Sequence, residues 1–381
     1  MEATRANQAY CVLKVLYMAL ELSVKKWVVL FSDGVRRRQV TVDAGDRTAL
    51  LAQIGLAKAR LKLAPHTPVV SCYEAGRDGF WLHRWLASVG VDNCVVDPAS
   101  IEVPQHAKRV KTDRVDVHKL MDLLVRWHGG GERRAWRVVR VPSVHDEDQR
   151  QLQRERARLL GDVTRAGNRI GSLLATQGLR LALNKGFTQA LAQLRCWDGT
   201  ALPVQLRAAI EQEWLRRELA GRQLAALQAQ QRRRLSQPAA DDVMAQQAKQ
   251  LMQLYAVGVQ SGWLLSAEIF AWREIHNRRQ LGALAGFTPT PYASGQSQRE
   301  QGISKAGNAR VRKAMIELAW LWLRWQGASA LSQWYQRRFG STGSTRSRRI
   351  GIVALARRLL VALWRYLEQG VIPEGAVLKT A

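Results

Sequence analysis

Four carboxylates in the N-terminal third of the chain have types and positions that suit metal chemistry. Glu21 and Glu74 each directly follow a mostly apolar run, as expected at the end of a buried strand. Asp113 and Asp116 are three residues apart at the expected start of a helix, so both side chains can face one point. Such acids repel one another unless a hard cation such as Mg²⁺ or Mn²⁺ binds between them. We therefore expect a catalytic metal site.

The charge of the chain indicates the substrate of such a site. The 381 residues include 58 Lys and Arg against 31 Asp and Glu, a formal net charge of +27. This excess favours a polyanion, with attraction that weakens steeply as salt is added. Two metal ions about 3.5–4 Å apart can orient an attacking oxygen and stabilise the leaving oxygen at a phosphodiester. The four carboxylates and the positive net charge together predict metal-dependent cleavage or joining of a nucleic acid.

Each acid also has an ordinary structural explanation. Asp113 and Asp116 can be first-turn acids stabilised by the helix dipole. Glu74 can be a loop residue and Glu21 a charge on an edge strand. Taken singly, these explanations are the better ones. The metal site is favoured only when all four acids are placed together on one α/β domain.

The first part of the chain alternates between patterns typical of strands and of helices. We expect a mixed sheet, because three strands joined by short turns precede strands that alternate with helices. An Asp33-Gly34 pair between the second and third strands is a strong hairpin signal. The expected strands are residues 12–23, 25–32, 35–43, 68–73 and 93–96, and the expected helices are 46–63, 78–89 and 113–127.

The rest of the chain has a helical pattern. We expect an α/β domain at 12–143, a helical coiled-coil linker or dimerisation region at 144–240, and a mostly α-helical domain at 241–381. Residues 211–235 form a long charged helix whose broken apolar stripe fits either a dimer contact or a solvated spacer. Residues 287–295 contain two prolines and should be a loop, followed by a helix at 310–325.

Other sequence features limit the setting. No apolar run approaches the roughly 20 residues of a membrane-spanning helix, so no membrane contact is expected. Four widely spaced cysteines without a CxxC pair indicate reduced thiols. No secretory signal is visible at the N-terminus, so we expect a cytoplasmic, nucleoid-associated bacterial protein.

Three short motifs together resemble one family. Residues 73–76 (YEAG), 111–116 (KTDRVD) and the C-terminal set Ser294-Gly295 with 302–308 (GISKAGN) are similar to the DEDD transposases of the insertion-sequence one-hundred-ten family. The resemblance covers roughly residues 15–145 and 250–345. It implies a ribonuclease-H-like, RuvC-like α/β domain that binds Mg²⁺ or Mn²⁺ through its four acids.

The resemblance also assigns the individual residues. The metal ligands become Glu21, Glu74, Asp113 and Asp116, although the first acid of the family is usually Asp. A C-terminal serine acts as the DNA nucleophile in the family, and Ser294 matches it. A serine that caps a turn is the ordinary alternative, and Ser297 and Ser304 are nearby competitors.

Basic and polar residues flank these motifs. We expect them to hold phosphates, although a solvated surface explains any one of them equally well. The candidates are Lys108, Arg109, Lys111, Arg299, Lys305, Asn308, Arg310 and Arg312.

The sequence therefore predicts a transposase that cuts and rejoins double-stranded DNA at element ends and at a target. By resemblance, its partners include a structured guide RNA and further copies of the chain, in a dimer or tetramer. Two alternatives stay open: a RuvC-like metal-dependent endonuclease that only hydrolyses DNA, and an inactive relative that only binds nucleic acid.

Overall fold

The computed structural model describes residues 14–101, 113–129, 131–132, 135–294, 297–340 and 344–379, with side chains undescribed at 99, 113–115 and 291–301. The chain divides into two compact units, residues 1–142 and 143–381. Each unit has hydrophobic cores of its own. Among the described residues, no helix is both long and apolar enough to cross a membrane.

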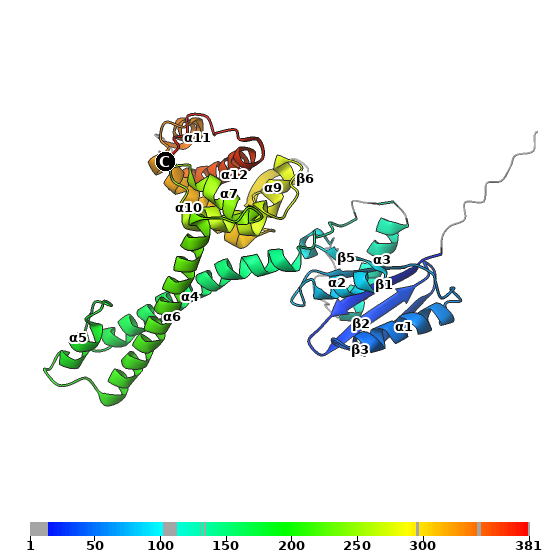
Figure 1. Ribbon diagram of the computed structural model, residues 1–381, viewed down its shortest axis with the longest axis horizontal. Helices are drawn as coiled ribbons and strands as arrows, with labels where there is room; N and C mark the ends of the chain where they lie inside the picture. Colours follow the sequence, from blue (N-terminus) through cyan, green and yellow to red (C-terminus); the bar gives the residue numbers. More distant parts are fainter. Residues whose placement is uncertain are drawn as a thin grey trace, which may run out of the picture. The chain divides into compact units, whose positions relative to one another are not determined.

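The first unit is an α/β unit built on one sheet (Figure 1). Its elements are β1 (Leu16–Leu22), β2 (Lys26–Ser32), β3 (Arg37–Asp43), α1 (Arg47–Arg60), β4 (Val69–Glu74), α2 (Trp81–Ser88), β5 (Val91–Val96), the short η1 (Pro98–Ser100) and α3 (Asp113–His128).

The five strands lie in the order β3-β2-β1-β4-β5. β1, β2 and β3 pair antiparallel, whereas β4 pairs parallel with both β1 and β5. The turn after β2 follows the hairpin signal: Gly34 has φ 98°, and Asp33 accepts hydrogen bonds from the backbone N–H groups of Val35 and Arg36. The expected α/β unit with a mixed sheet is confirmed.

Alternation along β1 separates the two faces of the sheet. Leu16, Met18 and Leu20 pack in one core with α1 and α2, whereas Tyr17 and Ala19 pack in another core with α3. β1 is buried on both sides because helices cover both faces, so it reads as a continuous apolar run. This alternation determines toward which face of the sheet the side chains at the end of β1 point.

The described part of the second unit is mainly helical and contains one β-hairpin. Its elements are α4 (Val144–Ala175), α5 (Phe187–Gln193), α6 (Val204–Ser236), α7 (Val243–Met252), α8 (Val259–Leu265), the π-helical turn η3 (Ser266–Phe270), α9 (Arg278–Leu284), β6 (Pro289–Ser294), β7 (Ser297–Ile303), α10 (Ala309–Trp325), α11 (Ala330–Tyr335), η4 (Gln336–Gly340) and α12 (Thr345–Gln369).

The long helix expected at 211–235 is α6, and it pairs within the chain with α4 (Figure 1). Leu215 and Leu219 of its broken apolar stripe are 56% and 51% exposed, which leaves both the dimer contact and the solvated spacer open. The side chains that are buried include Ile210 and Trp214, and Trp214 stacks on Phe187 of α5 with ring centroids 4.2 Å apart.

The expectation of a loop at 287–295 was also wrong in part. β6 and β7 form an antiparallel two-stranded sheet, with an irregularity between Pro289 and Pro291. A two-stranded ribbon tolerates prolines because its outer edges carry no ladder partner. Behind this hairpin, a core formed mainly by α10 and α12 includes Met315, Trp322 and Leu359.

A buried polar chain crosses three elements of the first unit. Ser71 of β4 donates to Asn93 Oδ1 of β5 at 2.7 Å, and Asn93 Nδ2 lies 2.9 Å from His83 Nδ1 of α2. Because an amide nitrogen donates, this contact requires an unprotonated Nδ1 on His83. Burial lowers the pKa of His83 below its usual value.

The lowered pKa of His83 predicts an acid-sensitive fold. The unfolded chain binds a proton near pH 6.5 more readily than the folded chain, so stability falls as pH drops through that value and is retained above it. His83→Gln keeps an acceptor without titrating, and it should flatten the dependence of Tm on pH between 5.5 and 7.5. His66→Gln, at an exposed position, is the control that should keep the original slope. Equal slopes in all three proteins would contradict the assignment.

Candidate active site

The register of β1 and β4 brings two of the four predicted acids together. Leu20 pairs with Tyr73 in the parallel ladder, so Glu21 and Glu74 occupy the next position on each strand. Both carboxylates therefore lie at the carboxyl ends of neighbouring strands, the edge at which α/β sheets bind ligands. Both residues are half-buried. Glu21 lies on a central strand, and the alternative that it is an edge-strand charge is wrong.

The two acids also share one face of the sheet. Ala19 and Cys72, two residues before Glu21 and Glu74, pack in the core that contains α3. Side chains two apart in a strand point to the same face. The backbone therefore directs Glu21 and Glu74 toward the face that α3 covers.

The direction of α3 determines which part of the helix lies near these acids. The Tyr17 hydroxyl, at the start of β1, lies 3.3 Å from His128 Nδ1 at the end of α3. Further along the sheet, Cys72 Sγ lies 3.9 Å from the Leu120 carbonyl oxygen. The first turns of α3, which contain the half-buried Asp116, therefore lie toward the carboxyl ends of β1 and β4.

Asp113 is the first residue of α3, and its side chain lies outside the described residues. Within the described part of the chain, no three His, Cys, Asp or Glu side chains gather closely enough to hold a metal ion. The carboxylate oxygens of Glu21, Glu74 and Asp116 are nevertheless the donor type that Mg²⁺ and Mn²⁺ prefer. Convergence of all four acids stays a prediction.

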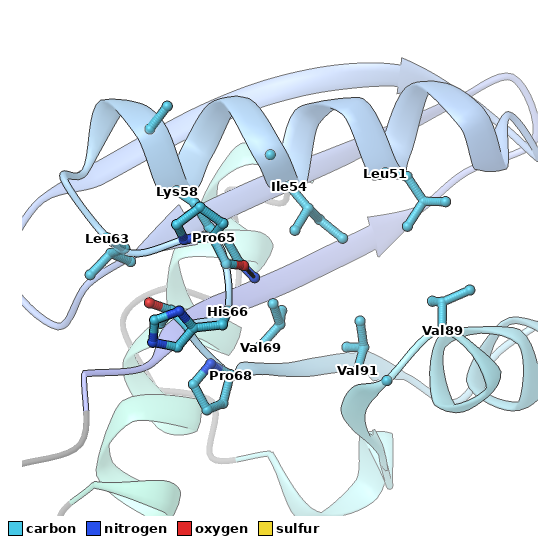
Figure 2. A pocket seen from close by; sticks show the side chains of 14 residues that line it. Leu51, Ile54, Lys58, Leu63, Pro65, His66, Pro68, Val69, Val89 and Val91 are labelled. Atoms are coloured by element: carbon cyan, nitrogen blue, oxygen red, sulfur yellow. Dashed lines mark hydrogen bonds between the residues drawn. The ribbon is translucent and has the colours of Figure 1, made fainter.

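A separate cavity of ≈ 480 Å³ lies at the other end of the sheet. Figure 2 shows Leu51 and Ile54 of α1 facing Val69 and Val91 at the starts of β4 and β5. The Lys58 ammonium has a structural role, because it donates a hydrogen bond to the Pro65 carbonyl oxygen at 2.7 Å. None of the described residues that line this cavity carries a carboxylate, and we assign the cavity no part in the metal site.

The predicted nucleophile lies at the tip of the hairpin in the second unit. Ser294 is the last residue of β6 and pairs with Ser297, the first residue of β7. Both side chains lie outside the described residues, and so does that of Arg299. Ser304, the other competitor, has its backbone N–H bonded to Thr288 at the base of the hairpin, at 2.8 Å. The backbone thus separates the tip serines from Ser304.

The turn at the base of the hairpin is tightly packed. Gly307 has φ 137°, and a Cβ there would lie 2.6 Å from the Leu284 carbonyl oxygen. Gly286 has φ 71°, and a Cβ there would lie 2.9 Å from the Ala306 carbonyl oxygen. The next residue, Asn308, donates its backbone N–H to Leu284 at 2.7 Å. These glycines are needed because only glycine avoids both the steric clash and the strain of positive φ.

Asn308 fixes the start of α10. Its Oδ1 accepts from the backbone N–H groups of Arg310 and Val311, which is an N-cap. Its Nδ2 donates at 2.9 Å to Oε2 of Glu268, a side chain only 2% exposed. Arg154 of α4 lies on the other oxygen of Glu268, at 3.6 Å. Asn308 therefore links the hairpin base to a buried carboxylate.

Arg312 has a similar structural use. Its Nη1 donates to the carbonyl oxygens of Lys305 and Ala285, at 2.9 and 3.2 Å. These bonds give Asn308 and Arg312 a structural role. Their contact with nucleic acid stays a prediction. Lys305 and Arg310 are exposed. The remaining predicted phosphate ligands lie outside the described residues: Lys108, Arg109 and Lys111.

Sequence reasoning missed Glu268. The signal was present, because this acid is the one charged residue in a mostly apolar stretch at 263–270, as Glu21 is in β1. It lies in the π-helical turn η3, a distortion that is often found at functional sites. Its partners are far apart in sequence and could not be read from spacing.

Comparison with known proteins supports one class. Residues 248–336, which include the hairpin and the start of α10, match the model of the transposase IS116/IS110/IS902 family. The putative transposase y4rJ of Sinorhizobium fredii is 37% identical over 377 residues, covering 96% of this chain and 95% of the relative.

Two more distant relatives agree. The transposase for insertion sequence element IS1111A of Coxiella burnetii is 24% identical over 75% of this chain and 74% of its own length. The probable family 20 transposase of Pseudomonas aeruginosa is 26% identical over 86% of this chain and 92% of its own. The class is therefore that of insertion-sequence transposases. This chain belongs to the IS116/IS110/IS902 family of transposases.

The bond from Asn308 to Glu268 yields a discriminating prediction. Asn308→Asp keeps the N-cap acceptor, but it removes the donor and places a second carboxylate beside a buried one. We expect a loss of about 2 kcal/mol or more in the free energy of unfolding. Asn277→Asp is the matched control, because Asn277 caps α9 at an exposed position and accepts from the corresponding two N–H groups. It should be neutral within about 0.5 kcal/mol. Equal effects, measured by denaturant unfolding, would refute the structural role of Glu268.

Proposed function

We propose that this transposase cuts and rejoins DNA at the ends of its insertion sequence and at a target. In this proposal Glu21, Glu74, Asp113 and Asp116 bind Mg²⁺ or Mn²⁺, and Ser294 is the nucleophile. The observation that carries the proposal is the placement of Glu21 and Glu74 on adjacent strand ends, on the face covered by α3. Family membership supports DNA as the substrate.

The proposed first step is a transesterification. The Ser294 hydroxyl attacks a DNA phosphorus, its proton passes to a base, and the bond from phosphorus to one strand segment breaks. That segment leaves as a protonated hydroxyl, and the other segment stays attached through a phosphoserine ester. A strand hydroxyl then attacks this ester, which releases Ser294 and rejoins DNA. Bound metal would supply positive charge beside the phosphate and the leaving oxygen.

The fold of the first unit supports a ribonuclease-H-like, RuvC-like assignment. It has a mixed sheet in which an antiparallel hairpin set is extended by parallel strands, with helices on both faces. The acids at the carboxyl ends of β1 and β4 occupy the edge that such a catalytic domain uses. Glu21 is one methylene longer than the usual Asp, and a carboxylate on the longer side chain can still ligate Mg²⁺.

We also propose the partners that the family resemblance implies. They are a structured guide RNA and further copies of the chain in a dimer or tetramer. The net charge of +27 suits binding to both DNA and RNA. The site of action would be the bacterial nucleoid, where the proposed substrate lies.

The serine assignment predicts a covalent intermediate. Full-length protein with Mg²⁺, its element's DNA and its RNA should form a protein–DNA adduct that survives denaturation. Ser294→Ala should abolish the adduct and strand exchange, because it removes the hydroxyl that attacks the phosphorus. Ser297→Ala, at the paired position of the same hairpin, is the control and should retain both activities.

The outcomes separate this proposal from two other activities. Cleavage without any adduct in wild-type protein would indicate a metal-dependent nuclease instead. DNA binding unchanged by chelator, with no cleavage under any metal, would indicate an inactive relative. An adduct that persists in Ser294→Ala and disappears in Ser297→Ala would move the nucleophile across the hairpin.

The acid assignment predicts metal binding that does not depend on activity. Mn²⁺ should raise the Tm of the wild-type protein, because a ligand that binds the folded state stabilises it. Glu74→Gln and Asp116→Asn should remove most of this shift. Asp122→Asn is the matched control on α3, because Asp122 is ion-paired with Arg37 on the surface. An equal Mn²⁺ shift in all four proteins would exclude Glu74 and Asp116 as ligands.

A further inference from the structure

A large groove in the second unit is lined by cations, and none of the described residues that line it is acidic. Its volume is ≈ 1440 Å³, and it lies between α12, α9, α11 and the base of the β6–β7 hairpin. Eight of its lining side chains are basic. Five of these are arginines of α12: Arg346, Arg349, Arg357, Arg358 and Arg365.

The remaining three cations lie on other elements around the groove. α9 contributes Arg278 and Arg279, and Lys305 follows the end of β7. Among the described residues, none of the eight takes part in an ion pair. Concentrating this many unneutralised charges in one groove costs free energy, which an anionic ligand would offset.

The floor of the groove is apolar and aromatic. Ile350, Val353 and Val361 of α12 alternate with the arginines, and Trp334 of α11 lies beside them. Arg358 stacks over the Trp334 ring at 4.0 Å. Ile350 is 57% exposed, so part of this floor faces solvent. A ligand that fits the groove must therefore present both negative charges and apolar faces.

We propose that this groove binds single-stranded DNA, with phosphates on the arginines and bases on the floor. A duplex presents phosphates and sugars outward and keeps its base faces stacked inside, so it would leave the apolar floor uncovered. A single strand offers both groups, which is the way that sequence-tolerant single-strand sites work. A second copy of this chain, with its net charge of +27, lacks the complementary charge.

The length of the groove agrees with this occupant. Its α12 residues run from Thr345 to Arg365, which is about 30 Å along a helix axis. A stacked strand of that length carries roughly nine phosphates. The eight basic side chains of the groove thus nearly match the number of phosphates on one strand of this length.

The groove begins at the base of the hairpin that carries Ser294, and this position indicates that the bound single strand is DNA. Pro289 and Ile303, which pair at the base of the hairpin, line one side of the groove. Ser294 lies five residues further along β6, about 16 Å away. If Ser294 holds a cut strand, as in the proposed function, that strand passes along the hairpin into the groove. Only this origin of the strand rests on the proposed function.

The test measures binding of a fluorescent twelve-nucleotide oligo(dT) to full-length protein by anisotropy, with chelator present so that no metal chemistry occurs. Arg346→Gln/Arg349→Gln removes two exposed groove cations. Arg324→Gln/Arg348→Gln removes two exposed arginines outside the groove, including one on the same helix. Ser294→Ala is a third variant, and thermal melts check that all three fold.

We expect the groove variant to bind oligo(dT) about tenfold more weakly or worse, since two charge-assisted contacts are lost. The slope of log K against log salt should also become shallower by about 1.4. The control pair should change affinity less than about threefold, and Ser294→Ala should bind like wild type. Loss of the covalent adduct in Ser294→Ala with retained binding would leave the groove assignment intact.

Three results would overturn the inference. Equal weakening by the two double variants would show only a general charge effect. Wild-type affinity in the groove variant would exclude the groove as the strand site. A groove variant that loses affinity for a twelve-nucleotide oligo(U) or a twelve-base-pair duplex, while keeping oligo(dT) affinity, would assign the groove to RNA or to double-stranded DNA.

Discussion

The parallel pairing of β1 with β4 is the constraint on which the chemistry of the first unit depends. The ladder that pairs Leu20 with Tyr73 carries Glu21 and Glu74 to the same edge and the same face. A shift of one residue in this register would turn one carboxylate toward the opposite core. The packing of Ala19 and Cys72 against α3 opposes that shift, because it would exchange the side chains presented to the two cores and turn a carboxylate toward an apolar one. The stability of the core and the position of the acids therefore have the same cause.

The second unit places its chemistry in a different way. Its hairpin rests on a turn in which Gly307 permits close backbone contact and Asn308 reaches the buried Glu268. Arg154 of α4 approaches the same carboxylate, so the long helical pair and the hairpin base meet at one buried acid. Asn308, one of the residues predicted to bind phosphate, is thus also used to hold the backbone at the base of the hairpin.

Local patterns predicted most elements of the first unit, because helices on both faces make its strands apolar and the turn after β2 contains Asp33 and Gly34.

Local patterns failed where partners distant in the sequence determine the structure. Pro289 and Pro291 argued against a strand, yet β6 forms because β7 follows directly. The buried face of α6 is set by α4 and α5, so Leu215 is exposed and Trp214 is buried. The four acids could be singled out from the sequence, but the adjacency of Glu21 and Glu74 depends on a long-range register. The arginine groove likewise exists only once α9, α11 and α12 are packed together.

The most direct test of the account is the position of the metal. A crystal structure of the full-length protein with DNA and Mn²⁺ would locate the ion by its anomalous scattering. We expect a peak about 2.2 Å from carboxylate oxygens of Glu21, Glu74 and Asp116, against a DNA phosphate. A DNA-bound structure in which Mn²⁺ is absent from these acids, or is held by other residues, would contradict it.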